Sequence, residues 1–293
     1  MIQWYPGHMA KAKRILKDDL KLVDIVIEVA DARIPLSSQN PDLRKLITEQ
    51  TKVTVLNKMD LADPEYNQKW LKHFKNKTDE DAVLLNSLTG EGVSELKSIL
   101  NNTYDRIAAK LSKKGRNPRR LRAMIIGIPN VGKSALINLL AGSNITTIGN
   151  KPGVTRGRQW VNVSKKIRLL DTPGILWPKF SDENKAYKLA LTGAVDNDIF
   201  DKELAAYKLL KFIIEINEDI LLDAYSLDFL EDHPYDILAD IGRKRGCLMT
   251  GAKVDRNRAA GIIINDFRDG KLGAITLEKP SEADKLKVEK ADE

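Results

Sequence analysis

One motif limits the folds open to this chain more than any other, the eight residues Gly127-Ile-Pro-Asn-Val-Gly-Lys-Ser134. A glycine-rich loop of this pattern binds phosphate through its backbone N–H groups, provided that it joins a strand to a helix. The apolar run 123–127 indicates that strand, and the periodicity of 133–140 indicates the helix. The sequence therefore predicts a phosphate-binding loop within an α/β sheet.

Four residues of this loop have distinct predicted roles. The N–H groups from Val131 through Gly132 to Ser134 are expected to point at the β-phosphate, aided by the positive end of the following helix dipole. Lys133 places its charge between the β- and γ-phosphates, and the Ser134 hydroxyl is a predicted Mg²⁺ ligand. Together they predict a site for a nucleoside triphosphate with Mg²⁺.

Two later motifs are expected to contact the γ-phosphate and Mg²⁺ beside the phosphate loop. Asp171 ends an apolar run and opens Asp171-Thr-Pro-Gly174, so its carboxylate can hold a water on Mg²⁺, while the Gly174 N–H can reach the γ-phosphate. Thr155, in Pro152-Gly-Val-Thr, is the predicted switch hydroxyl that ligates Mg²⁺ only in the triphosphate state. Thr146 and Thr147 are alternatives for this role.

The base-recognition residues follow two other predicted strands. In Asn57-Lys58-Met-Asp60 the carboxylate of Asp60 can accept two hydrogen bonds from guanine, which adenine cannot offer. Asn57 is expected to brace neighbouring loops, and the stem of Lys58 to cover the base. About thirty residues later, Ser87 is placed to donate its backbone N–H to guanine O6. This pattern favours GTP over ATP.

The order of these motifs is unusual. In the common GTP-binding fold the phosphate loop comes first, whereas here the base loops at Asn57 and Ser87 precede it. A closed site does not depend on where its chain is cut, provided that the old termini can be joined. The sequence thus predicts a circularly permuted P-loop domain, a mostly parallel sheet with helices on both faces. It also predicts that the second switch leads directly into the next domain.

Three segments are expected along the chain. Residues 1–178 form the permuted nucleotide-binding domain, 179–280 a smaller, mostly helical domain, and 281–293 a flexible charged tail. Within the second domain the runs 261–265 and 273–277 are β-like and predict a small hairpin.

Composition and charge indicate which binding partners and which cellular compartment to expect. The net charge of the 293 residues is +7, and one run carries basic residues with no acidic residue between them: Arg106, Lys110, Lys113, Lys114, Arg116, Arg119, Arg120 and Arg122. Such a run favours RNA binding over a solvated linker face. Cys247 is the only cysteine, and no apolar run approaches the length of a membrane span. We expect a cytoplasmic protein without membrane contact.

These motifs, with the N-terminal Gln3-Trp-Tyr-Pro-Gly-His-Met-Ala and the run Asp31-Ala-Arg-Ile-Pro35, resemble the ribosome biogenesis GTPase A family of bacteria. The resemblance is close over residues 1 to about 180 and looser beyond. It implies a GTPase that acts late in assembly of the large (50S) ribosomal subunit and binds its ribosomal RNA. It also implies that the subunit and K⁺ stimulate hydrolysis. We expect a monomer off the ribosome.

Two further roles follow from the resemblance. Ile175 occupies the position where many GTPases have a water-orienting glutamine, and the family points to His8 for that task. A histidine packed beneath the N-terminal helix is the alternative interpretation. Asn130 resembles the asparagine of potassium-dependent GTPases, and a loop-bracing asparagine is its alternative.

Two other functions remain open from the sequence. One is a GTPase in RNA modification, although the chain has no recognisable catalytic cysteine or methyl-donor site. The other is a non-hydrolysing, GTP-sensing RNA scaffold, which Ile175 keeps possible.

Overall fold

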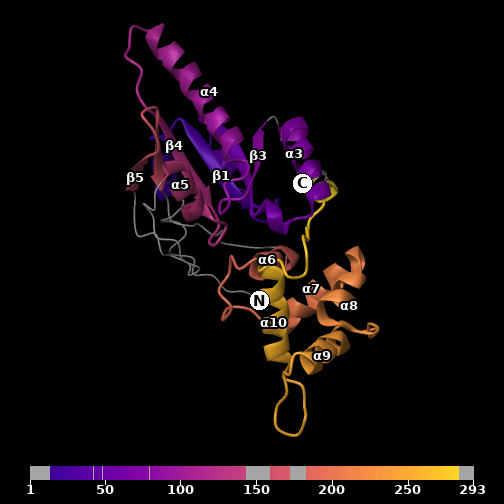
Figure 1. Cartoon of the computed structure of the whole chain (residues 1–293). Helices are drawn as coiled ribbons and strands as arrows, with labels where there is room; N and C mark the ends of the chain where they lie inside the picture. The colour runs from indigo at the N-terminus through magenta and orange to yellow at the C-terminus, as the bar shows by residue number, and fades with distance from the viewer. Residues whose placement is uncertain are drawn as a thin grey trace, which may run out of the picture. The chain divides into compact units, whose positions relative to one another are not determined.

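The computed structural model describes residues 14–41, 43–47, 49–78, 80–142, 159–171 and 183–283 (Figure 1). These residues form two compact units. The sheet unit contains the described residues up to 171 together with 278–283, and the helical unit contains 183–277.

The sheet unit is built on six strands in the order β3-β2-β1-β4-β6-β5. The strands are β1 Ile25–Asp31, β2 Thr51–Asn57, β3 Asp81–Leu85, β4 Leu121–Gly127, β5 Gln159–Asn162 and β6 Ile167–Asp171. All neighbouring pairs are parallel except β5 with β6. The predicted, mostly parallel α/β sheet is therefore confirmed. The short edge strand β5 was missed, since a strand of four residues with one neighbour needs little apolar pattern.

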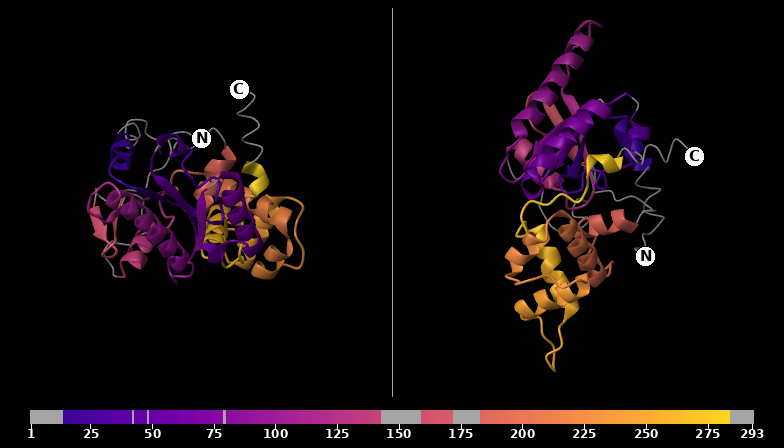
Figure 2. Two further views of the ribbon diagram at one scale, coloured as in Figure 1. Left: turned by 90° about the horizontal axis from the view of Figure 1, so that it is seen from above. Right: turned by 90° about the vertical axis from the view of Figure 1, so that its right-hand side faces the viewer.

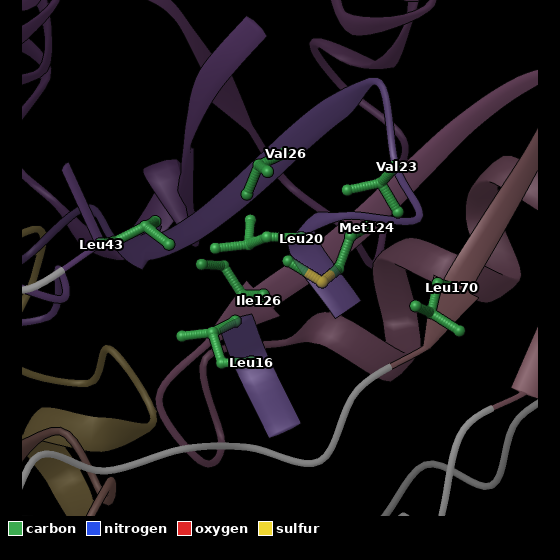
Figure 3. Close-up of a cluster of buried hydrophobic side chains, with 8 residues drawn as sticks. All are labelled: Leu16, Leu20, Val23, Val26, Leu43, Met124, Ile126 and Leu170. Carbon is green, nitrogen blue, oxygen red and sulfur yellow. The ribbon is translucent and has the colours of Figure 1, made fainter. Parts of the chain in front are cut away.

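Helices cover both faces of this sheet, which explains why all seven residues of β1 are buried. The helical residues 14–20, α2 (Leu43–Leu46) and α3 (Pro64–Thr78) pack on one face. Figure 3 shows part of this core, a buried cluster that contains Leu16, Leu20, Val26, Met124 and Leu170. The other face is covered by α4 (Val93–Ser112) and α5 (Lys133–Ala141), which contact β3 and β4.

The helical unit consists of α6 to α10. Their bounds are α6 Glu183–Leu191, α7 Lys202–Ile216, α8 Asp219–Tyr225, α9 Pro234–Lys244 and α10 Arg256–Arg268. α10 contacts α6, α7 and α9 and so lies at the centre of the unit (Figures 1 and 2). The side chains of Asp201, His233 and Asp255 accept hydrogen bonds from the first turns of α7, α9 and α10. No helix in the described ranges is long and apolar enough to cross a membrane.

The predicted hairpin of 261–265 and 273–277 is wrong. Residues 261–265 lie inside α10, because Ala259, Ala260, Ile263, Ile264 and Phe267 form a single buried face at helical spacing. The isoleucine run raised β-propensity locally, but burial against the neighbouring helices decided the conformation.

The chain also leaves the helical unit earlier than expected. Glu278 and Ala283 belong to the sheet unit, where they are 1% and 6% exposed. The predicted flexible tail therefore begins too early at 281, because apolar packing of Ala283 and hydrogen bonds to Glu278 fix this segment. Residues 284–293 lie outside the described part of the chain.

Candidate nucleotide-binding site

The carboxyl ends of the parallel strands bring the predicted motifs to one edge of the sheet. Asp31 at the end of β1 pairs with Asn57 at the end of β2, and Val29 pairs with Gly127 at the end of β4. Asp171 ends β6 opposite Ile125. In open α/β sheets this edge is where ligands bind. Loops far apart in the sequence thereby become neighbours.

The phosphate loop approaches its neighbours so closely that two positions admit only glycine. A Cβ on Gly127 would lie 2.5 Å from the carbonyl oxygen of Val29. Gly132 has φ of +100°, and a Cβ there would lie 2.2 Å from Nδ2 of Asn57. Asn130 also adopts the left-handed region, with φ of 58°. These conformations turn the chain sharply between β4 and α5.

α5 begins at Lys133 immediately after this turn. The Lys133 side chain is 8% exposed and curls back over its own loop, where Nζ donates to the carbonyl oxygen of Ile128 at 2.7 Å. Ser134 is half-buried in the first turn of the helix. A helix start that presents backbone N–H groups, a lysine and a hydroxyl is suited to a phosphate with its Mg²⁺.

Asn57 joins three loops of the site. Its side chain is fully buried, and Nδ2 donates to the carbonyl oxygen of Val131 at 2.8 Å and to Oγ of Ser87 at 3.1 Å. In return, Oδ1 accepts the N–H of Ser87 at 3.0 Å. One amide therefore holds both base loops and the phosphate loop in a fixed mutual position.

This geometry changes the predicted role of Ser87. Its backbone N–H was expected to donate to guanine O6, but the structure pairs that N–H with Asn57. Ser87 is 9% exposed and serves to fix the loop. The next two N–H groups, of Leu88 and Thr89, donate to Oδ1 of Asn86 at 2.9 and 3.2 Å, which shapes the turn that follows.

Lys58 and Asp60 lie where a base can reach them. Lys58 adopts the left-handed region with φ of 60°, directly before the short helix η1 (Met59–Leu61), and Asp60 in that helix is exposed. The Lys58 ammonium lies 3.1 Å from Oδ2 of Asp31. The lysine stem is thus anchored at its tip.

A buried ion pair behind Lys58 was not identified as part of the site from sequence. Arg33 and Asp31 are each 1% exposed and form a two-pronged contact, Nε to Oδ1 at 2.9 Å and Nη2 to Oδ2 at 2.8 Å. Burial acts to raise the pKa of Asp31, but the charges of Arg33 and Lys58 outweigh it and hold that pKa well below its usual range. The run Asp31-Ala-Arg33 directly after a buried strand was the available signal.

Other predicted site residues lie outside the described part of the chain, namely His8, Thr155 and Gly174. The backbone of Asp171 is placed as the last residue of β6, and its side chain is outside the described residues.

The basic run divides into two groups. Arg119 forms two hydrogen bonds of 2.7 Å with Asp24, Arg106 donates to Thr51, and Arg120 donates to Asn162. The second group, Lys110, Lys113, Lys114 and Arg116, is exposed at and just beyond the end of α4, which extends beyond the sheet in Figure 1.

A phosphate loop and guanine-type base loops, joined in permuted order on a mostly parallel sheet, define a circularly permuted GTPase. Residues 122–232 match the family described as 50S ribosome-binding GTPase. The ribosome biogenesis GTPase A of Priestia megaterium is 44% identical over 97% of this chain and 98% of its own length. That of Thermotoga maritima is 32% identical over 96% and 95%. The chain belongs to the ribosome biogenesis GTPase A family.

Solved structures agree with this assignment. A GDP-bound structure of YlqF is 28% identical, with a TM-score of 0.65 over 92% of this chain and all of that one. The GNP-bound YlqF from T. maritima is 29% identical, with a TM-score of 0.62 over 92% of this chain and 98% of that one.

Proposed function

We propose that this protein hydrolyses GTP during late assembly of the large ribosomal subunit, in association with ribosomal RNA, and that subunit binding accelerates hydrolysis. The observation that carries the nucleotide part is the Asn57 bridge, because it assembles the phosphate loop and both base loops into one pocket. The relatives named as ribosome biogenesis GTPases support the ribosomal part.

The pocket fits a guanine nucleotide with Mg²⁺. The Gly132 turn packs its backbone against the Asn57 side chain, which leaves no room for a Cβ, and Ser134 offers a hydroxyl in the first turn of α5. Ser134, Asp171 and Thr155 would hold the ion, which supplies charge neutralisation at the phosphates. When the nucleotide binds, the Lys133 ammonium would leave the carbonyl oxygen of Ile128 and contact the phosphates. The Asp60 carboxylate would select guanine by accepting its two hydrogen bonds.

Water activation falls to residues outside the usual glutamine position. Ile175 can neither donate nor accept a hydrogen bond, so we assign orientation of the attacking water to His8 and contact with the γ-phosphate to the Gly174 N–H. We also assign Asn130 as a ligand of a K⁺ ion. Its backbone adopts the left-handed region within the phosphate loop, an uncommon conformation that supports a specific role at this position.

Charge separates the helical unit into a part that repels RNA and a part that attracts it. The stretch from 212 to 242 contains no lysine or arginine but carries Glu215, Glu218, Asp219, Asp223, Asp228, Glu231, Asp232, Asp236 and Asp240. The following stretch carries Arg243, Lys244, Arg245, Lys253, Arg256 and Arg258. We therefore place the RNA contact of this unit on the second stretch.

That second stretch includes a projecting turn, Cys247–Asp255, which together with the basic residues on either side of it we call the basic hairpin (Arg243–Arg258). It is closed by an antiparallel bridge between Leu248 and Val254, with Met249 N–H donating to Lys253 O at 2.8 Å. Leu248 and Met249 are half exposed at 50% and 52%. Figures 1 and 2 show the connection between α9 and α10 standing out from the unit. Together with the exposed end of α4, it gives two basic surfaces for RNA.

The first experiment measures GTP hydrolysis with and without purified large subunits, in KCl and again in NaCl. Stimulation by the subunit, greater in KCl, is the expected result. Absence of stimulation in both salts would remove the assembly role and leave a guanine-nucleotide switch.

A second experiment tests the RNA contact by pelleting the protein with large subunits. The double variant Lys253→Glu, Arg258→Glu is expected to bind the subunits more weakly. The slope of log K against log salt concentration is expected to fall by roughly one unit for each phosphate contact that is lost. The variant Lys202→Glu, Lys211→Glu on α7 changes net charge equally and is the matched control. Equal binding by both variants would reject the basic hairpin as an RNA contact.

We also propose that the protein is cytoplasmic and is a monomer off the ribosome. Sedimentation without subunits tests the monomeric state.

A further inference from the structure

The chain returns to the sheet unit through a short segment, Glu278–Ala283, which we call the C-terminal strap. The Glu278 carboxylate accepts the N–H of Leu36 at 2.6 Å and that of Ser37 at 3.1 Å, and it also accepts the Ser37 hydroxyl. Its backbone carbonyl accepts Nε1 of Trp70 at 3.1 Å. A residue more than 200 positions away in sequence thus binds the loop that follows β1.

That loop, residues 31–40, is directly bonded to the guanine-recognition motif. The Ala32 N–H donates to the carbonyl oxygen of Asn57 at 2.8 Å, and Asp31 contacts the Lys58 ammonium. Within the loop, the N–H of Asp31 donates to Oγ of Ser38 at 3.0 Å. Its position therefore determines where Lys58 lies.

Apolar packing makes a second connection. Ala283 of the strap shares a buried cluster with Trp70, Leu56 and Ala62, and Met59 packs against that cluster. Met59 lies between Lys58 and Asp60 in the sequence. The strap is thus linked to the base-recognition residues by hydrogen bonds on one side and by side-chain packing on the other.

Two backbone N–H groups of the loop depend on the strap for their acceptor. The N–H groups of Leu36 and Ser37 receive their acceptor from Glu278. Without that carboxylate, two N–H groups at a largely buried position lose their partner, and the loop has to shift toward water to recover one. Such a shift moves Asp31 and Ala32, which hold Lys58 and Asn57.

We propose that Glu278 is a positioning residue for guanine recognition, acting through the 31–40 loop on Lys58 and Asp60. It touches no nucleotide itself. The inference rests on guanine-nucleotide binding at the proposed site and adds a determinant from the far end of the chain. Its effect is expected to fall mainly on the base, because the loop bonds directly to Lys58 and to the backbone of Asn57 and reaches the phosphate loop only through the Asn57 side chain.

The test compares Glu278→Gln with the wild-type full-length chain. Affinities for GDP and for inosine diphosphate, which lacks the 2-amino group, are measured by competition against a fluorescent GDP analogue. We expect the Kd for GDP to rise about tenfold, equivalent to about 1.4 kcal/mol. The preference for GDP over inosine diphosphate is expected to fall about threefold, since a misplaced Asp60 reads the amino group less well. kcat at saturating GTP is expected to stay unchanged.

Asp24→Asn is the matched control. Asp24 is also a largely buried carboxylate of the sheet unit that accepts a backbone N–H, from Arg122, but it precedes β1 at the opposite edge of the sheet. This variant is expected to lower the Tm without altering the GDP to inosine diphosphate ratio. A merely structural role for Glu278 would give the same pattern in Glu278→Gln.

Ser37→Ala is the milder second variant, for use if Glu278→Gln does not fold, because it removes one donor and keeps both backbone bonds. It is expected to change the ratio in the same direction by a smaller factor. An unchanged GDP affinity and ratio in the folded variants overturns the proposal, while the proposed function survives. Failure of the wild-type chain to bind GDP instead overturns the proposed function.

Discussion

The Asn57 bridge can be tested by removing its amide. Asn57→Ala deletes both donors and the acceptor, leaving the Val131 carbonyl and the Ser87 N–H without the partners they have now. Asn57→Asp keeps the shape but replaces Nδ2 with an oxygen that would lie 2.8 Å from the Val131 carbonyl oxygen. Asn57→Asp keeps an acceptor for the Ser87 N–H but introduces electrostatic repulsion and a buried charge.

The expected size follows from the burial of these groups. Leaving a buried donor or acceptor unpaired costs about 1–3 kcal/mol. Two such groups therefore imply a loss of about 2–6 kcal/mol in the free energy of unfolding for Asn57→Ala, since Asn57 and Val131 are at most 1% exposed. Asn57→Asp is expected to lose more, because a buried carboxylate would face the negative end of the Val131 carbonyl dipole inside the fold.

Urea unfolding measures this loss, and titration with a fluorescent GDP analogue measures its effect on the pocket. Under conditions where the variant is folded, we expect the Kd for GDP to rise at least tenfold, because the base loops and the phosphate loop are no longer held together. Asn101→Ala, on the exposed surface of α4, is the control for the same change of side chain. Wild-type affinity in Asn57→Ala would refute the role assigned to the bridge.

Three further outcomes are expected. Gly132→Ala abolishes GDP binding in the same titration, because its φ and the 2.2 Å approach to Asn57 leave no room for a Cβ; retained binding would contradict this. Asp31→Asn lowers the free energy of unfolding by about 3 kcal/mol at neutral pH. Folding depresses the pKa of the Asp31 carboxyl, so the stabilisation by this carboxylate is complete above its unfolded pKa of about 4. This stabilisation is lost as the pH falls toward the folded pKa. The acid denaturation curves of Asp31→Asn and wild type therefore converge at low pH. The double variant Lys113→Glu, Lys114→Glu weakens binding to large subunits without changing Tm. Arg119→Glu lowers Tm, because it places a second carboxylate beside Asp24. The reverse pattern would reject the division of the basic run into an RNA-binding group and a structural group.

Local residue patterns specify the sheet and the chemistry at its edge. Uninterrupted apolar runs such as 25–30 predict strands buried on both faces, and β1 is buried throughout. The phosphate loop and the base motifs carry their chemistry in residue type and spacing, so their permuted order follows from the amino-acid sequence alone. Patterns of this kind suffice wherever the deciding interactions lie within a few residues.

Contacts between residues far apart in the chain settle the remaining features. The run 261–265 has the local preference of a strand, but burial against neighbouring helices makes it part of α10. Ser87 donates its N–H to Asn57, thirty residues away, so its expected role changed. Glu278 finds its donors at Leu36 and Ser37, and no periodicity links such positions. Hydrogen bonds and packing between distant segments form only once the chain has folded, and these contacts turn separate motifs into one binding site.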